Sequence, residues 1–238
     1  HPADPIQPDN IRDLQARVKE TGADIGLAFD GDADRVFVTD EKAEGISGSL
    51  ITALVAEAML DREPGATILH NVICSWVVPE VIRERGGTPV RTRVGHSLIK
   101  KVMAETGAVF GGEHSGHYYF RDHYRADSGI VAALIVMERL SQAGGTMSEL
   151  LAPYRRYHDS GEINSTVADQ QGKIEELATA FADGKQDRLD GLTVEYEDWW
   201  FNVRPSNTEP LLRLNVEART AELLEEKTAR LLRLIRGE

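Results

Sequence analysis

A six-residue segment, Asp30-Gly31-Asp32-Ala33-Asp34-Arg35, most constrains what this chain can fold into. It places three carboxylates at alternating positions between two apolar runs, residues 25–29 and 36–38. Short apolar runs bounded by turn residues are typical of buried strands. We therefore expect a tight loop between two strands, where the three carboxylates converge.

The carboxylates of this loop predict a site for a hard divalent cation. Three like charges so close repel one another, and carboxylate oxygens are the ligands that Mg²⁺ and Ca²⁺ prefer. Asp30, Asp32, Asp34 and Glu41 fall on ligand positions of a calcium EF-hand, but that loop needs glycine where this chain has Arg35, and it needs flanking helices. A polar turn without an ion is the other alternative. We predict Mg²⁺, with Asp30, Asp32 and Asp34 as its ligands.

Charge and cysteine content limit the partners and the compartment. The chain has 238 residues and a net charge of -12 at pH 7, which argues against nucleic acid or an anionic membrane as the main partner. No apolar run has the length of a membrane-spanning helix. The single cysteine, Cys74, allows no intrachain disulfide and suits a reducing cytoplasm, and we expect it to be a small buried core residue.

The pattern of helices and strands predicts the fold class. Helical and strand patterns alternate from Leu50 to Phe110, which favours an α/β domain with a parallel sheet and crossover helices on both faces. After Asp159 the pattern becomes that of a compact α+β unit, and we expect residues 41–48 to be a linker. We predict three domains: residues 1–43, the remnant of a preceding α/β domain; residues 44–156, the parallel-sheet domain; and residues 157–238, the α+β domain.

Two loops of the predicted parallel-sheet domain carry polar side chains. Ligands of such sheets bind beyond the carboxyl ends of the strands, where these loops lie. In residues 112–117, Glu113 and Ser115 can accept from and donate to neighbouring sugar hydroxyls, although a glycine-rich turn with exposed histidines fits as well. His96 follows Gly95 at a helix start, and its pKa suits proton exchange near neutral pH, although a lone histidine is usually structural.

A third loop, Arg204 to Pro210, connects two predicted strands of the last unit and favours phosphate. The planar guanidinium of Arg204 matches a phosphate group, Ser206 and Thr208 add hydroxyls, and successive backbone N–H groups can form an anion nest. A polar hairpin turn is the alternative. Together, the metal loop and these three loops predict a phosphosugar site.

The four motifs also resemble one family when taken in order. Asp-Gly-Asp-Ala-Asp-Arg, Val-Gly-His-Ser-Leu-Ile-Lys-Lys, Gly-Glu-His-Ser-Gly-His and Arg-Pro-Ser-Asn-Thr-Glu-Pro have the order and spacing of the α-D-phosphohexomutases. The bacterial phosphomannomutase/phosphoglucomutase branch is the nearest match. The resemblance implies a four-domain enzyme that interconverts hexose 1-phosphate and hexose 6-phosphate. It implies Mg²⁺, a phosphoserine donor and a bisphosphate intermediate.

The resemblance also implies a role for each matching residue. Asp30, Asp32 and Asp34 match the metal ligands, and Glu113 and Ser115 match the residues that read the 3- and 4-hydroxyls of the sugar. The implied catalytic residues are Arg35, His96 and His117, with either histidine as the acid/base. The implied ligands of the non-reacting phosphate are Arg204, Ser206, Asn207 and Thr208.

The sequence departs from the family pattern in ways that affect activity. The family's serine loop, Thr-Ala-Ser-His-Asn-Pro, is absent, and no Ser-His pair occurs in the 238 residues. We therefore expect a fragment that needs the missing N-terminal domains and is inactive alone. Ile73 and Trp76 stand where many members carry basic residues.

Other functions remain open at the level of the sequence. A phosphoglucosamine mutase is one alternative, although that branch usually has glycine at the position of Asn207. A non-catalytic module that binds a phosphosugar or Ca²⁺ is the other. The preference between mannose and glucose phosphates and the oligomeric state are not indicated.

Overall fold

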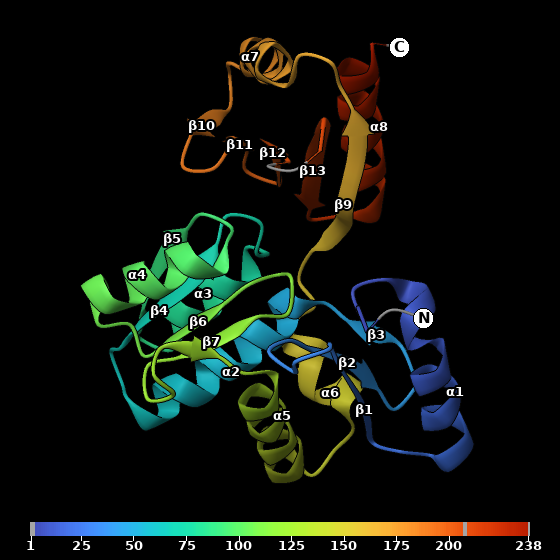
Figure 1. Cartoon of the computed structure of the whole chain (residues 1–238), viewed down its shortest axis with the longest axis vertical. Coiled ribbons are helices and arrows are strands. Elements are labelled where there is room, and N and C mark those ends of the chain that lie inside the picture. Colours follow the sequence, from blue (N-terminus) through green and yellow to red (C-terminus); the bar gives the residue numbers. More distant parts are fainter. Residues whose placement is uncertain (1–2, 207–208, 238) are drawn as a thin grey trace. The chain divides into compact units, whose positions relative to one another are not determined.

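A computed structural model describes residues 3–206 and 209–237 of the chain, apart from the side chain of His96 (Figure 1). The chain forms two compact units, His1–Arg155 and Arg156–Glu238. The three-part domain division stays a prediction, because the contacts within the chain separate these two units and no third.

The first unit begins with a small antiparallel sheet. The elements are η1 (Pro8–Ile11), α1 (Arg12–Thr21), β1 (Ile25–Phe29), β2 (Val36–Asp40) and β3 (Gly45–Ile46). The sheet order is β1-β2-β3, and α1 packs on β1. The predicted strand, loop and returning strand are confirmed. The prediction of a linker over residues 41–48 is wrong, because Gly45–Ile46 pairs with β2 as a third strand and α2 starts at Gly48.

The main sheet of the first unit is mixed. Its strands are β4 (Thr67–Asn71), β5 (Thr88–Thr92), β6 (Phe110–Gly112), β7 (Tyr118–Phe120) and β8 (Ala126–Asp127), in the order β5-β4-β6-β7-β8. Strands β5, β4 and β6 are parallel, as predicted. Strands β7 and β8 continue the sheet in the antiparallel sense, and the sequence pattern did not indicate them.

Helices cover both faces of this sheet, as expected. The helices of this part of the chain are α2 (Gly48–Arg62), α3 (Val77–Glu84), α4 (His96–Thr106), α5 (Gly129–Ala143), α6 (Met147–Leu151) and the short η2 (Ala152–Tyr154). Helices α2, α3 and α4 pack on the sheet, and α5 packs on α2 and β2. Since β5 and β6 flank β4 on opposite sides, right-handed crossovers place α3 and α4 on opposite faces. Neighbouring glycines of β6 fit this arrangement: a Cβ on Gly112 would meet Thr52 of α2, and one on Gly111 would meet Ile99 of α4.

The second unit is an antiparallel sheet covered by two helices. Its elements are β9 (His158–Thr166), α7 (Gln170–Ala180), β10 (Lys185–Asp187), β11 (Leu192–Glu195), β12 (Trp199–Pro205), β13 (Leu211–Ala218) and α8 (Ala221–Arg236). The sheet order is β10-β11-β12-β13-β9, and α7 and α8 contact each other and share one apolar core with the sheet. The α/β class of the first unit and the α+β class of the second are therefore confirmed.

Two further expectations concern single features of the chain. Cys74 is buried, as predicted, and burial raises the pKa of its thiol to about 12. Over residues 3–206 and 209–237, the structure contains no helix with the length and apolar character needed to span a membrane.

Candidate functional site

The metal loop is the tight turn between β1 and β2. Asp30 directly follows β1, Arg35 directly precedes β2, and Ala33 adopts a left-handed conformation with a φ of 60°. One carboxylate oxygen from each of Asp30, Asp32 and Asp34 lies within 4.8 Å of the other two. Strands flank the loop on both sides, so the EF-hand alternative is wrong.

Charge within the loop is only partly neutralised. Arg35 donates to Asp30 through Nε, at 2.7 Å, and through its backbone N–H, at 3.1 Å. Burial acts to raise the pKa of Asp30, but these hydrogen bonds outweigh it, and the pKa lies below its ordinary value. Burial and the neighbouring Asp30 carboxylate raise the pKa of Asp34. Three converging hard oxygen donors with residual repulsion fit a divalent cation such as Mg²⁺.

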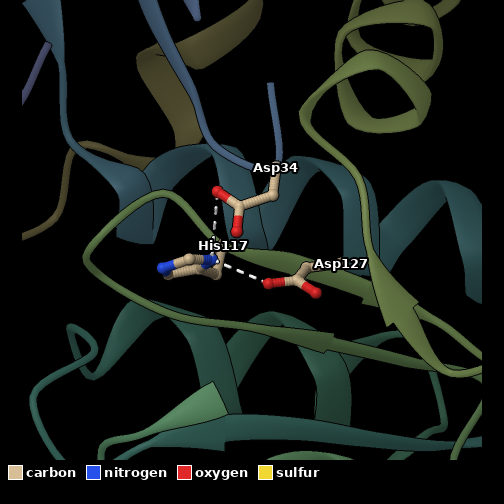
Figure 2. Close-up of side chains that lie close together, drawn as sticks. All are labelled: Asp34, His117 and Asp127. Carbon is tan, nitrogen blue, oxygen red and sulfur yellow. Dashed lines mark hydrogen bonds and ion pairs between the residues drawn. The ribbon is translucent and has the colours of Figure 1, made fainter. Parts of the chain in front are cut away.

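The metal loop is joined to the loop that carries His117. Arg35 and His117 form an antiparallel β-bridge, and the Val36 N–H donates to the Gly116 carbonyl at 3.3 Å. Figure 2 shows the His117 ring facing two carboxylates: its Nδ1 lies 2.9 Å from Asp127 Oδ2 and 3.8 Å from Asp34 Oδ1. One predicted metal ligand, Asp34, and one predicted acid/base residue, His117, therefore lie next to each other in the first unit.

Asp127 and Lys100 belong to this cluster, and sequence reasoning did not single them out. Asp127 lies on β8, and the Nζ atom of Lys100 on α4 is 2.8 Å from its Oδ1. Burial acts to raise the pKa of Asp127, but Lys100 outweighs it, so the pKa lies below its ordinary value. Lys100 stands four residues, or about one turn, after His96 on the same helix. This spacing could have indicated that Lys100 lies on the same helix face as His96. Strand β8 is only two residues long, so no pattern pointed to Asp127.

Glu113 is buried, with 1% of its surface exposed. Its Oε1 accepts from the Gly95 N–H at 3.1 Å and from Asn71 Nδ2 at 3.3 Å, and its Oε2 accepts from the Tyr119 hydroxyl at 2.9 Å. The carboxylate therefore anchors the turn that leads into α4. Ser115 is half-buried at the tip of the same loop. The reading of sugar hydroxyls by these two residues stays a prediction.

His96 is the first residue of α4, as the sequence indicated. The preceding Gly95 has a φ of 131°, a conformation that side-chain-bearing residues rarely adopt. The Glu113 carboxylate holds the Gly95 N–H, so the start of α4 is tied to the loop of Glu113 and His117. The His96 side chain is outside the described part of the structure, and its role as an acid/base stays a prediction.

The predicted phosphate loop lies in the second unit, between β12 and β13. Arg204 is part of β12 and is 5% exposed, and its Nη1 donates to Asn215 Oδ1 at 2.9 Å. Its Nη2 pairs with the Glu162 carboxylate. Burial lowers the pKa of Arg204, although Glu162 acts in the opposite direction.

Ser206, the other predicted phosphate residue that the structure describes, is also buried, with 8% of its surface exposed. Ser206 accepts a hydrogen bond of 3.4 Å from Nη2 of the half-exposed Arg213. Asn207 and Thr208 lie outside the described residues. The phosphate site therefore stays a prediction in all four of its residues.

Comparison with family models identifies the class of protein. The chain matches three models: "Phosphoglucomutase/phosphomannomutase, alpha/beta/alpha domain II" over residues 1–45, domain III of the same series over residues 47–157, and its C-terminal domain over residues 162–234. The chain belongs to the phosphoglucomutase/phosphomannomutase family of α-D-phosphohexomutases.

Individual relatives agree with this assignment. The chain is 43% identical to a phosphomannomutase of Salmonella montevideo, over 97% of this chain and 52% of the relative, and 42% identical to that of Escherichia coli K12, with the same coverage. A solved phosphoglucomutase/phosphomannomutase family protein of Burkholderia thailandensis has a TM-score of 0.87 and 35% identity, over 99% of this chain and 52% of that one. The chain spans about half the length of the curated relatives it matches.

Proposed function

We propose that this chain supplies the metal site and the sugar-phosphate residues of a phosphohexomutase. The enzyme interconverts hexose 1-phosphate and hexose 6-phosphate through a bisphosphate intermediate, with mannose or glucose phosphate as substrate. Family membership and phosphomannomutase relatives near 40% identity support the proposal. The observation that carries it is the contact between the metal loop and His117, because phosphoryl transfer between hydroxyls needs a cation and a proton carrier at one place.

Asp30, Asp32 and Asp34 would hold Mg²⁺. When bound, the cation supplies electrostatic stabilisation of the charge that develops on a transferring phosphoryl group. The guanidinium of Arg35 is held in place by Asp30 and, at 3.3 Å, by Asp4. Arg35 thereby adds positive charge next to the carboxylates and keeps the loop closed.

The remaining residues of the first unit bind the sugar and move protons. His117 exchanges a proton with a sugar hydroxyl, and His96 is the second candidate for this step. Glu113 and Ser115 read the hydroxyls of the ring, and Glu113 also fixes the turn before His96 through the Gly95 N–H.

In the second unit, we assign the non-reacting phosphate to Arg204, Ser206, Asn207 and Thr208. In this assignment residues 1–43, 44–156 and 157–238 are the end of the second, the third and the fourth mutase domain. We further propose that the chain alone binds substrate without turnover, because no Ser-His pair is present in it to provide the phosphoserine. The single buried cysteine supports a cytoplasmic location.

Calorimetric titration with mannose 1-phosphate and glucose 1-phosphate, with and without Mg²⁺, tests the proposal. We expect saturable binding that Ser115→Ala weakens about fivefold to tenfold, the effect of one lost hydrogen bond. Ser141→Ala is the matched control, because this exposed serine lies on α5 and donates to the Met137 carbonyl of its own helix.

The same titrations separate the alternatives. Tighter binding of glucosamine 1-phosphate than of either hexose phosphate would favour a phosphoglucosamine mutase. Binding of Ca²⁺ without any sugar phosphate would favour a non-catalytic module. The absence of binding by all of these ligands would contradict the proposed function.

A further inference from the structure

Next to His117 lies a connected pair of charged side chains, Lys100 and Asp127. Lys100 of α4 and Asp127 of β8 form an ion pair of 2.8 Å, and the other oxygen of Asp127 lies 2.9 Å from His117 Nδ1. Asp127 is 8% exposed, while His117 is 20% exposed. The carboxylate is therefore held inside the protein, with each of its oxygens on a different partner.

The Tyr119 ring lies beside the His117 ring, and the two planes are at a small angle. The two ring centroids are 6.1 Å apart, with an angle of 23° between the planes. The Nζ atom of Lys100 lies 5.8 Å from the centroid of the same Tyr119 ring. Tyr119 also pairs with Asp127 across the β7–β8 ladder, so the sheet fixes the carboxylate and the tyrosine relative to each other.

The charges of this cluster determine which His117 nitrogen carries the proton. The ionised Asp127 carboxylate, paired with Lys100, can only accept hydrogen bonds. The His117 Nδ1 atom, at 2.9 Å from it, therefore has to be the donor. Neutral histidine has one N–H, and Nε2 is then left with a free lone pair. Figure 2 shows Nε2 pointing away from both carboxylates.

We propose that Asp127 is a positioning residue, which holds His117 in the Nδ1–H tautomer and leaves Nε2 free to take the proton of a substrate hydroxyl. Lys100 orients Asp127 for this task. The inference rests on the proposed function in one respect, namely that His117 exchanges protons with substrate. As Nε2 takes the hydroxyl proton, the ring becomes an imidazolium, and its Nδ1–H remains hydrogen-bonded to Asp127. The proton returns from Nε2 to a sugar oxygen in the reverse direction.

Asp127 fits this role better than Asp34. The Asp34 oxygen is 3.8 Å from Nδ1, beyond hydrogen-bond distance, and Asp34 belongs to the three carboxylates that converge in the metal loop. A carboxylate that also binds a cation, as proposed for Asp34, cannot hold the His117 ring in the same orientation with and without the cation. Asp127 lies on β8 and contacts the His117 ring with one carboxylate oxygen, while Lys100 holds the other oxygen.

The test reads the His117 tautomer directly by ¹⁵N NMR of the whole 238-residue chain, labelled at its seven histidines. Spectra are taken about two pH units above the ordinary histidine pKa, so that neutral rings are compared. His117→Gln identifies the signals of this ring by their loss. In the parent we expect a protonated Nδ1 and an unprotonated Nε2, with a preference of at least about tenfold for this tautomer. A parent that is mainly protonated on Nε2 would overturn the proposal without any variant.

Asp127→Asn gives a sharper expectation, because Lys100 can only donate hydrogen bonds. The Lys100 ammonium group will donate to the amide oxygen of the new side chain, and the amide NH₂ will then face His117 Nδ1. Nδ1 then has to accept, so we expect the His117 tautomer to change to Nε2–H. In the double variant with Lys100→Met the amide can turn, and we expect the Nδ1–H form to return. An Asp127→Asn spectrum identical to the parent would overturn the proposal.

Controls separate this effect from misfolding and from a failure of the proposed function. Asp122→Asn makes the same chemical change at an exposed carboxylate between β7 and β8 and should leave the His117 signals unchanged. Backbone amide spectra establish that each variant is folded. Mannose 1-phosphate is then added to the parent. If the Nδ1–H tautomer is present but the Nε2 signal does not respond to the sugar phosphate, the positioning by Asp127 stands and the proposed substrate is wrong.

Discussion

A methyl group on Gly129 should separate the metal loop from the domain that supports it. Gly129 is the first residue of α5, and its N–H donates to the Ala33 carbonyl at 3.1 Å. A Cβ at this position would lie 2.6 Å from the carbonyl carbon and oxygen of Arg35, where ordinary contact begins near 3.4 Å. Both partners are backbone, so in Gly129→Ala the loop has to move by about 0.8 Å, the difference between these two distances.

The size of the effect follows from two opposing contributions. Overpacking costs about 1–3 kcal/mol, while the helix preference for alanine over glycine offsets up to about 1 kcal/mol. Together they allow a fall of about 0–3 kcal/mol in the free energy of unfolding, and we expect a value near the middle, about 1–2 kcal/mol. Because Arg35 adjoins Asp34, the three carboxylates should also lose their arrangement, and the affinity for Mg²⁺ should fall about tenfold.

Urea unfolding without Mg²⁺ and calorimetric titration with Mg²⁺ measure the two effects. Gly45→Ala is the matched control, because the nearest atom to its added methyl is a side-chain carbon of Ile11 at 4.0 Å. Its unfolding and its Mg²⁺ affinity should match the parent. The reasoning is refuted if Gly129→Ala unfolds at the parent's urea concentration and binds Mg²⁺ with the parent's affinity.

Three further predictions concern buried polar groups. Arg204→Met should lower the free energy of unfolding by about 2–4 kcal/mol in urea titrations, because the buried Asn215 amide oxygen loses its donor and Glu162 keeps only the more distant Arg213 at 3.7 Å. Exposed Arg219→Met should change it by less than about 0.5 kcal/mol. Tyr118→Phe should leave thermal stability unchanged or raise it by up to about 1 kcal/mol, because the hydroxyl is buried without a hydrogen-bond partner in the described part of the chain; a clear loss would contradict this. Burial lowers the pKa of His70 to about 3. The unfolded chain therefore binds a proton below about pH 6.5 that the folded chain does not, and the free energy of unfolding should fall by up to about 1.4 kcal/mol per pH unit between pH 6 and 4, less steeply in His70→Gln.

Local features of the site were predictable from the sequence. The metal loop is one continuous segment between two apolar runs, so its strand–loop–strand geometry depends on neighbours in the chain. The start of α4 at His96 was also predictable, because it depends on Gly95, the residue directly before it in the chain. The parallel part of the main sheet was also predictable, because each strand is followed by an amphipathic helix.

Contacts that depend on short strands were not predictable. Strands β7 and β8 have three and two residues, too few to establish a period, and their pairing is what brings Asp127 to His117. Sequence likewise does not tell whether a polar residue faces a ligand or the interior. Glu113 and Arg204 were both predicted as ligand contacts; both side chains are buried with protein partners, and their contact with a ligand stays a prediction.

The central claim is that the metal loop and His117 form one site, and the most direct measurement follows His117 while Mg²⁺ is added. With ¹⁵N-labelled histidine, the His117 ring signals should shift saturably with Mg²⁺, because Asp34 lies 3.8 Å from Nδ1. Asp32→Asn, which alters a ligand of the same loop that is not part of the group formed by Asp34, His117 and Asp127, should abolish the shift. If Mg²⁺ binds and the His117 signals stay in place, the metal loop and His117 act independently, and the account is contradicted.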